Sequence, residues 1–411
     1  MEKILNQKHA KETIYYAVSR ILERTSFNGF RTIFIFYMLG ETLKMDKEEA
    51  AYIFGAFMGS LFITQIIGAL FGDLLIGNRK SIIIGGIIQA IGVFSLCITS
   101  MSGLYVGLVL ITIGNGLYTP NFLSSFGKSY LTKTKLLDSA FTILFLAVNI
   151  GSFLGPFYIG YAMDLYGEKI GFLIAGILML LSIIPIILLK KQPIIEIEIK
   201  KYSVKKINIA TILITIVVVG LFWIVYDIAN IRILDLQSQF IESSFFEIPK
   251  YYWKSMNLWF VVPISIIAMI VWSYFYNSQI AKLIVGFIFG IISFGMLLFI
   301  PEIPSDNHVL IYLISLLFLG IAEVHISPLI YSILTKYSNP KYLTILLSIS
   351  FIPLKLFSLV FGLFGNIIFD NPAFALKIGL VLMMIIAIGL ILYVRIIKNC
   401  NNNKEITIDK I

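Results

Sequence analysis

Four formal charges stand close together in an apolar segment near the start of the chain. Residues 13–40 are enough to cross a bilayer at about 1.5 Å per residue, and they include Arg20, Glu23, Arg24 and Arg31. On a helix the three arginines share one narrow stripe, and the glutamate lies beside it. A charge inside a membrane costs roughly 2.5–3.5 kcal/mol on insertion scales, so it normally faces a protein interior or a water-filled cavity. We therefore expect this helix to line an internal cavity.

The elements that must position these charges are membrane helices. The chain has 411 residues, of which 58% are hydrophobic and 13% charged, which excludes an ordinary soluble protein. Apolar runs of about 20 residues or more predict transmembrane helices. There are twelve such runs: 13–40, 50–76, 81–100, 103–127, 139–162, 170–190, 207–233, 253–276, 281–300, 308–335, 343–369 and 374–397.

The distribution of basic residues predicts the orientation of these helices. If both termini are cytoplasmic, 21 of the 32 Lys and Arg residues fall on the cytoplasmic side and six on the other side. Basic residues concentrate on the cytoplasmic side of membrane proteins. We therefore expect a multi-pass protein of a bacterial inner membrane with both termini inside. Orientation and attraction to anionic lipid explain the net charge of +9, so no nucleic-acid partner is expected.

A basic linker divides the chain into two halves with six predicted helices each. The predicted units are an N-terminal bundle at 1–190, a cytoplasmic linker at 191–206, a C-terminal bundle at 207–398 and a cytoplasmic tail at 399–411. This is an all-α membrane protein. Its two cysteines, Cys97 and Cys400, are too few for a metal site.

The loop between the second and third runs resembles a signature of the major facilitator superfamily. It reads GALFGD from Gly68 and GNRK from Gly77. The resemblance implies two helical halves that rock around a site near the middle of the membrane. It also implies a charge relay between Asp73 and Arg79. A plain loop with cytoplasmic basic residues is the alternative.

Further segments, in order along both halves, resemble the proton-dependent oligopeptide transporter family within that superfamily. The similarity covers about residues 19–350. Its segments are ERTSFNGFR at 23–31, GNGLYTPN at 114–121, DSAFT at 138–142, FWIVYD at 222–227, SMN at 255–257 and GIAEVHISP at 320–328. The resemblance implies a secondary transporter that imports di- and tripeptides by proton symport with alternating access.

The resemblance also implies a site with positive charge on one side and negative charge on the other. Arg31, with Arg24 nearby, would bind the peptide carboxylate, because guanidinium and carboxylate form paired hydrogen bonds. Glu323, one turn before Ser327, would bind the α-ammonium group. The remaining candidates are the amides Asn149 and Asn257, which would hydrogen-bond the peptide, and the apolar walls Trp223, Tyr118 and Phe27. Ordinary packing is the alternative for the aromatic residues.

Proton coupling is where the chain departs from the family. The family's first acid in this region is Arg20 here, and its lysine in the fourth span is Thr119, so a charge pair tied to proton movement is missing. The acids that remain in the spans are Glu23, Asp227 and Glu323. A carboxylate that alternates between buried and solvated surroundings can take up and release a proton.

Each coupling candidate has an alternative role. Glu23 can handle the proton or form a permanent ion pair with Arg24. Asp227 can carry the proton or form a gate pair with Arg232. Lys355 stands in the middle of a predicted span, where it needs an acidic partner or water. It can pair with an acid and change the ammonium site, or line an aqueous cavity without a role in transport.

Other functions fit the sequence less well. The same fold could carry another zwitterion or an anion, or work as an uncoupled uniporter, because the coupling pair is missing. A peptide sensor would need a soluble signalling domain, and the predicted cytoplasmic segments are too short for one. No metal-binding cluster, nucleophile–base pair or phosphate-binding loop supports an enzyme or a cofactor. The expected partners are small peptides, protons and lipid, and the oligomeric state stays open.

Overall fold

The computed structural model describes most of the chain, namely residues 2–3, 8–189, 209–243, 256–350, 352–353 and 371–408. Lys355, the linker 191–206 and most of the predicted span 343–369 lie outside the described residues. Twelve α-helices occur in the described part. Nine of the described helices are long and apolar enough to cross a membrane.

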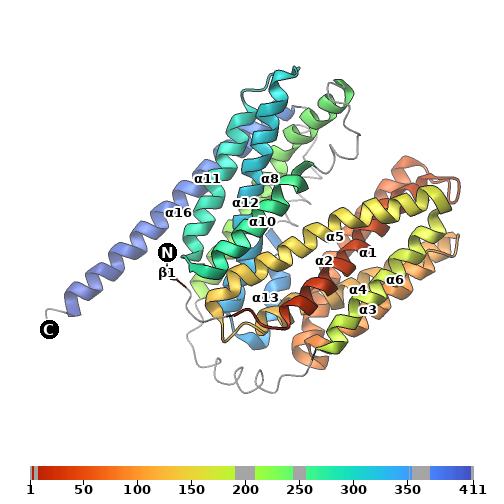
Figure 1. The fold of residues 1–411 in the computed structure, drawn as a ribbon, viewed down its shortest axis with the longest axis horizontal. Helices are drawn as coiled ribbons and strands as arrows, with labels where there is room; N and C mark the ends of the chain where they lie inside the picture. The colour runs from red at the N-terminus through yellow and green to blue at the C-terminus, as the bar shows by residue number, and fades with distance from the viewer. Residues whose placement is uncertain are drawn as a thin grey trace.

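The helices form two bundles that follow the two halves of the sequence (Figure 1). The N-terminal bundle contains α1 (Thr13–Leu39), α2 (Lys47–Leu70) with its π-helical extension η1 (Phe71–Ile76), α3 (Asn78–Ser95), α4 (Met101–Lys128), α5 (Leu137–Tyr166) and α6 (Glu168–Leu188). The C-terminal bundle contains α8 (Ile209–Ser243), α10 (Met256–Tyr274), α11 (Gln279–Leu297), α12 (Asn307–Tyr337), α13 (Leu343–Ile349) and α16 (Pro372–Ile408). Every predicted span therefore begins within three residues of the first residue of an observed helix.

Short elements complete the chain. Two single-turn 3₁₀ helices, η2 (Thr134–Leu136) and η3 (Pro340–Tyr342), precede α5 and α13. Strand β1 (Glu2–Lys3) pairs antiparallel with β2 (Phe275–Tyr276), so the start of the chain contacts the C-terminal bundle. This pairing was not predicted from the sequence.

The last helix is longer than the sequence suggested. We expected the bundle to end at residue 398 and a tail to follow, but α16 continues to Ile408 and projects beyond the bundle (Figure 1). No Pro or Gly occurs between Gly389 and Ile408. Because helix formation propagates residue by residue in the absence of a breaker, the helix continues into this polar segment.

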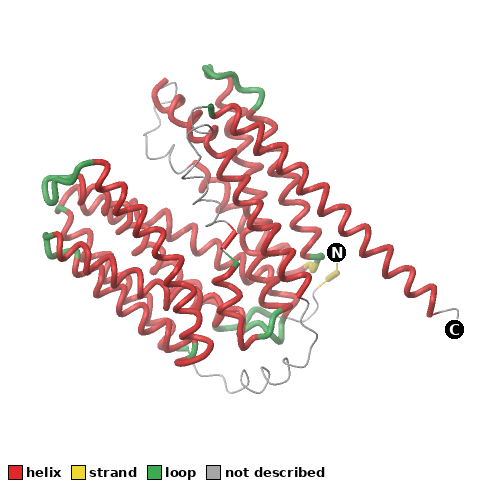
Figure 2. The backbone as a smooth tube through the Cα atoms, turned by 180° about the vertical axis from the view of Figure 1, so that it is seen from behind, coloured by secondary structure: helices red, strands yellow, loops and turns green. Residues whose placement is uncertain are grey.

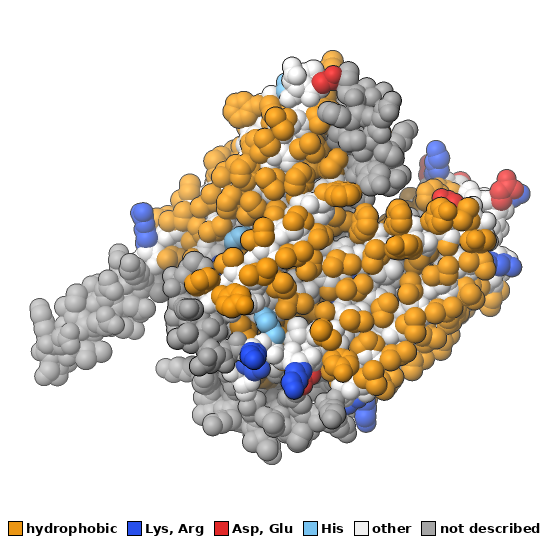
Figure 3. All heavy atoms as spheres, viewed as in Figure 1, with side chains coloured by type: hydrophobic (Ala, Val, Ile, Leu, Met, Phe, Trp, Pro, Cys, Tyr) orange, Lys and Arg blue, Asp and Glu red, His pale blue; other side chains and the backbone are white. Residues whose placement is uncertain are grey.

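The outer surface is that of a membrane protein. Apolar side chains cover the visible sides of both bundles, while most of the visible charged side chains lie toward the ends (Figure 3). Large exposed side chains such as Ile63, Val109 and Leu188 contribute to this surface. Within the bundles, α1 packs against α5 and α6, and α4 packs against α2 and α3. The helix that carries the clustered charges is therefore surrounded by protein on several sides.

Glycines allow helices α2 and α4 of the N-terminal bundle to pack closely. A Cβ atom added to Gly68 of α2 would lie 2.1 Å from the carbonyl oxygen of Gly116 in α4. A Cβ atom on Gly116 would lie 2.3 Å from the carbonyl oxygen of Thr64. Small residues at such contacts let membrane helices approach at backbone distance. Gly59, on the same helix α2, has no atom within 4 Å of an added Cβ.

We expect Gly68→Ala to destabilise the protein and Gly59→Ala to leave it nearly unchanged. The first substitution forces α2 away from α4, and overpacking of this kind costs about 1–3 kcal/mol. The second makes the same chemical change on the same helix without a clash. Thermal unfolding in detergent measures the difference, and equal melting temperatures for the two variants would contradict the helix packing described here.

Candidate functional site

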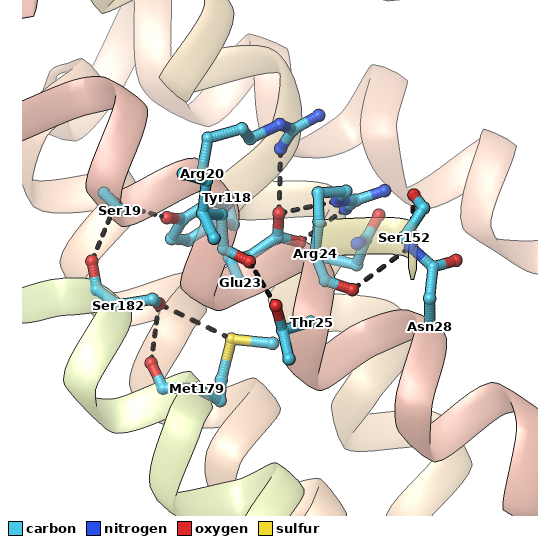
Figure 4. A network of polar contacts seen from close by, with 12 residues as sticks. Ser19, Arg20, Glu23, Arg24, Thr25, Asn28, Tyr118, Ser152, Met179 and Ser182 are labelled. Carbon is cyan, nitrogen blue, oxygen red and sulfur yellow. Dashed lines mark hydrogen bonds and ion pairs between the residues drawn. The ribbon is translucent and has the colours of Figure 1, made fainter. Parts of the chain in front are cut away.

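The charged cluster on α1 is a buried ion-pair network (Figure 4). Glu23 is fully buried, and both of its carboxylate oxygens accept hydrogen bonds. Arg24 donates from Nε to Oε2 at 2.6 Å and from a terminal nitrogen to Oε1, while Arg20 donates to Oε2 at 3.0 Å. Two guanidinium groups thus share one carboxylate, and the three residues carry a net charge of +1.

Contacts with neighbouring helices hold α1 in this position. The Ser19 hydroxyl donates to the carbonyl oxygen of Ser182 in α6 at 2.7 Å and hydrogen-bonds to the Tyr118 hydroxyl of α4 at 2.9 Å. The Asn28 side-chain amide donates to Ser152 of α5 at 3.0 Å. At Gly151 of α5, an added Cβ would lie 2.6 Å from the Cβ of the neighbouring arginine of α1. The network is therefore fixed by packing against three helices.

Arg31 differs from the other two arginines of α1. It is partly exposed, and it forms no ion pair or side-chain hydrogen bond with any residue that the structure describes. Arg24, in contrast, is held by Glu23 and lies over the ring of Phe27, with Cζ 4.9 Å from the ring centroid. Within the described part of α1, Arg31 is the arginine that has no ion-pair partner.

A second polar cluster lies in the C-terminal bundle around Glu323 of α12. The side chain is buried, and its Oε1 accepts hydrogen bonds from the Tyr226 hydroxyl at 2.9 Å and from Asn257 Nδ2 at 3.0 Å. The side-chain oxygens of Asn257 and Ser327 are buried and have no hydrogen-bond partner. Glu323 forms no ion pair with the described residues. A carboxylate, an amide oxygen and a hydroxyl are together suited to a cation that donates hydrogen bonds, such as an ammonium group.

The structure places the other predicted site residues as follows. Asn149 donates to the carbonyl oxygen of Phe145 at 2.9 Å, within its own helix α5. Phe27 and Tyr118 are buried in the N-terminal bundle, which favours packing over a role as pocket walls. Trp223 is half-buried and packs edge-on against Tyr226, with the ring centroids 5.0 Å apart.

Two predicted ion pairs have other partners in the structure. Arg232 pairs with Asp235 and donates to the carbonyl oxygen of Pro301 at 2.7 Å, so the suggested pair with Asp227 is corrected. A spacing of three residues puts Arg232 and Asp235 on one helix face, which favours that pair. In the loop signature, Asp73 pairs with Lys128 of α4 at 3.3 Å.

Arg79, the predicted partner of that aspartate, instead donates to the carbonyl oxygen of Ile187 at 2.7 Å. The carboxylate of Asp73 also accepts from the backbone nitrogen of Ile345 at 3.1 Å and from the Thr344 hydroxyl, both in the first turn of α13. The signature therefore connects the two bundles, but through α13 and not through Arg79.

The two bundles meet at one end, which we call the closed end. Figure 2 shows that they diverge away from it. Asp138, at the start of α5, accepts hydrogen bonds from Gln279, Lys282 and Ser332 of the C-terminal bundle. The described side-chain hydrogen bonds between the bundles all lie at this end. Sequence reasoning missed these contacts, because they join residues more than 100 positions apart.

His9 is a further contact at the closed end that the sequence did not suggest. Its Nδ1 hydrogen-bonds to the Tyr130 hydroxyl at 2.8 Å, and its Nε2 hydrogen-bonds to Ser273 of α10 at 2.9 Å. Burial and the nearby ammonium group of Lys133 lower the pKa of the His9 imidazole from its ordinary 6.5. The pKa of Tyr130 is raised to about 12 by burial, so this hydroxyl stays protonated.

We expect acid to weaken the contact made by His9. Because its pKa is lower in the folded protein, the neutral ring stabilises the fold fully above pH 6.5, and this contribution is lost as the pH falls through the folded pKa. The melting temperature of the wild type should therefore fall more steeply below pH 6.5 than that of His9→Gln. Parallel curves for the two proteins would show that His9 does not titrate in this contact.

Comparison with known proteins agrees with this architecture. The chain matches the model of the Major Facilitator Superfamily over residues 17–352. It is 32% identical over 175 residues to the uncharacterized transporter YclF of Bacillus subtilis (strain 168). The aligned residues make up 41% of this chain and 36% of that protein. It is 26% identical over 264 residues to dipeptide and tripeptide permease B of Xenorhabdus bovienii (strain SS-2004), 62% of this chain and 54% of that protein.

A solved structure extends the similarity to nearly the whole chain. A POT family transporter in complex with thioalcohol conjugated peptide superposes with a TM-score of 0.67 at 18% identity, over 94% of this chain and 98% of that one. The matches to the two curated relatives span 36% and 54% of their lengths.

The chain belongs to the Major Facilitator Superfamily, since that family's model matches most of its length. The predicted fold is thereby confirmed. The family is one of transporters and not of enzymes, as the sequence indicated. The relatives and the solved structure support the predicted resemblance to the oligopeptide transporter branch.

Proposed function

We propose that this protein imports di- and tripeptides as a secondary transporter, by proton symport with alternating access. The observation that supports it most is a pair of opposite binding groups on the two bundles. Arg31 of α1 has a guanidinium group without a described partner, and Glu323 of α12 stands among unpaired acceptors and forms no ion pair with the described residues. A peptide carries a carboxylate at one end and an ammonium group at the other.

The chemistry of a short peptide suits this arrangement. At about 3.3–3.6 Å per residue, an extended di- or tripeptide spans roughly 7–10 Å. Arg31 would bind the carboxylate through two parallel hydrogen bonds. Two nitrogens of Arg24 already donate to the carboxylate of Glu23. Arg24 would therefore add positive charge near the peptide carboxylate without contacting it directly. Recognition of the two ends leaves the peptide side chains to less specific surroundings, which allows broad specificity.

The contacts at the closed end provide a gate. If the termini are cytoplasmic, as the basic residues predict, the closed end is the cytoplasmic one and the structure represents the state open to the outside. Delivery of the peptide then requires the contacts of Asp138 and Asp73 with the C-terminal bundle to break. These contacts are hydrogen bonds and ion pairs, which can be exchanged for water when that end opens.

We place the proton step on Asp227 and Glu323. Glu23 is held in an ion pair by two guanidinium groups, which indicates a structural role for this carboxylate. Asp227 is exposed on α8, beside Tyr226, whose hydroxyl reaches Glu323. A proton taken up by Asp227 from the outside and passed to Glu323 would neutralise the carboxylate and release the ammonium group. In this chain Arg20 and Thr119 replace the two residues of the family's charge pair. Because that pair is lost, uncoupled transport is the second candidate.

We expect Arg31→Gln and Glu323→Gln each to weaken dialanine binding at least about thirtyfold. Each removes one charged partner of a peptide end, and losing one side of a buried charge pair costs about 2–5 kcal/mol. Arg79→Gln is a matched control, because this arginine only donates to a backbone carbonyl away from the site. Titration calorimetry on the purified protein measures the affinities. Wild-type affinity in either site variant would sink the corresponding assignment.

A further inference from the structure

The ion-pair network on α1 has one positive charge too many for its own carboxylate. Arg20 and Arg24 share Glu23, and Arg20 forms no ion pair with any other acid in the described part of the chain. Its guanidinium carbon lies 5.4 Å from the centroid of the Phe122 ring of α4. Tyr331 of α12, in the other bundle, lies within electrostatic range of both arginines. A buried excess charge needs a counter-charge.

Unpartnered hydrogen-bond donors lie at the same place. Arg20 donates to Glu23 through one terminal nitrogen, and its Nε is buried without a partner. The Thr119 hydroxyl of α4 is also buried without a partner. Thr119 and Phe122 are three residues apart and share a helix face, so the hydroxyl lies on the side of α4 that Arg20 packs against. The side chains of Arg20 and Thr119 are each more than nine-tenths buried.

The free edge of the guanidinium group indicates which anion fits. Glu23 takes Nη1, which leaves Nε and Nη2 as two parallel donors along one edge. Parallel donors of this kind match the two oxygens of a carboxylate. A hydroxyl such as that of Thr119 can donate a further hydrogen bond to the same group.

We propose that Arg20 and Thr119 form a subsite for a carboxylate on a substrate side chain, so that the protein prefers peptides with an acidic residue. This rests on the proposed function, in which Arg31 and Glu323 bind the two ends of the peptide. Arg20 and Arg31 are eleven residues apart, about 16 Å along α1. The acidic side chain therefore extends toward the closed end, away from the peptide carboxylate.

The test uses three pairs of tripeptides, one pair for each position of trialanine. In each pair that position is Glu in one peptide and Gln in the other. Calorimetry gives the affinity of the purified wild type, Arg20→Gln, Arg20→Lys and the control Arg79→Gln for each pair. In the wild type, at least one Glu peptide should bind tenfold or more tightly than its Gln counterpart. That ratio should fall to about one in Arg20→Gln and persist in Arg79→Gln. In Arg20→Lys it should be smaller than in the wild type but stay above one, because lysine keeps the positive charge and lacks the two parallel donors.

Two results would overturn the inference. The first is that the wild type binds the Glu and Gln peptides of all three pairs with affinities that agree within threefold, or binds no tripeptide at all. The second is a preference for the Glu peptide that survives in Arg20→Gln. Trialanine itself separates this inference from the proposed function: if trialanine binds and the Glu and Gln peptides do not differ, only the acidic subsite is wrong. Arg20→Lys guards against a folding defect in the neutral variant.

Discussion

Charges placed inside an apolar helix impose the constraint on which this structure depends. A bilayer offers no water to Arg20, Glu23 and Arg24, so the protein must supply partners. It does so by packing α1 against α5 and α6, by side-chain contacts with α4, and by letting two guanidinium groups share one carboxylate. With Arg20 and Arg24 both paired to Glu23, Arg31 is the arginine of α1 left without a described ion-pair partner, which is why we propose it as a binding group.

The proposed alternating access adds a second constraint, which is that the two bundles must separate without unfolding. Their described polar contacts are confined to one end, where Asp138 and Asp73 of the N-terminal bundle bind groups of the C-terminal bundle. Each bundle retains its own tightly packed helices, as at the α2–α4 glycine contact. The molecule therefore combines rigid halves with a contact that water can replace, which is the mechanical requirement for alternating access.

Hydropathy sufficed to predict the helices, because every backbone polar group in a bilayer must be satisfied within its own segment. The predicted run 170–190 and the observed α6 (Glu168–Leu188) illustrate the agreement. The ion pair of Glu23 with Arg24 was one of the two alternatives that the sequence left open, and Arg20 joins it from three residues away on the same helix face. Partners from distant segments were not predictable: Asp73 pairs with Lys128, and Asp138 with Lys282. Tyr226, which contacts Glu323, was missed because a tyrosine in a membrane helix usually indicates packing.

The most direct test of this account is uptake of labelled dialanine into proteoliposomes that contain the purified protein, with and without an inward proton gradient. Symport predicts that the gradient drives accumulation above the external concentration and that collapsing the gradient abolishes it. Equal uptake under both conditions would contradict proton coupling and indicate a uniporter. Absence of dialanine uptake under either condition would contradict the central claim that this protein transports small peptides.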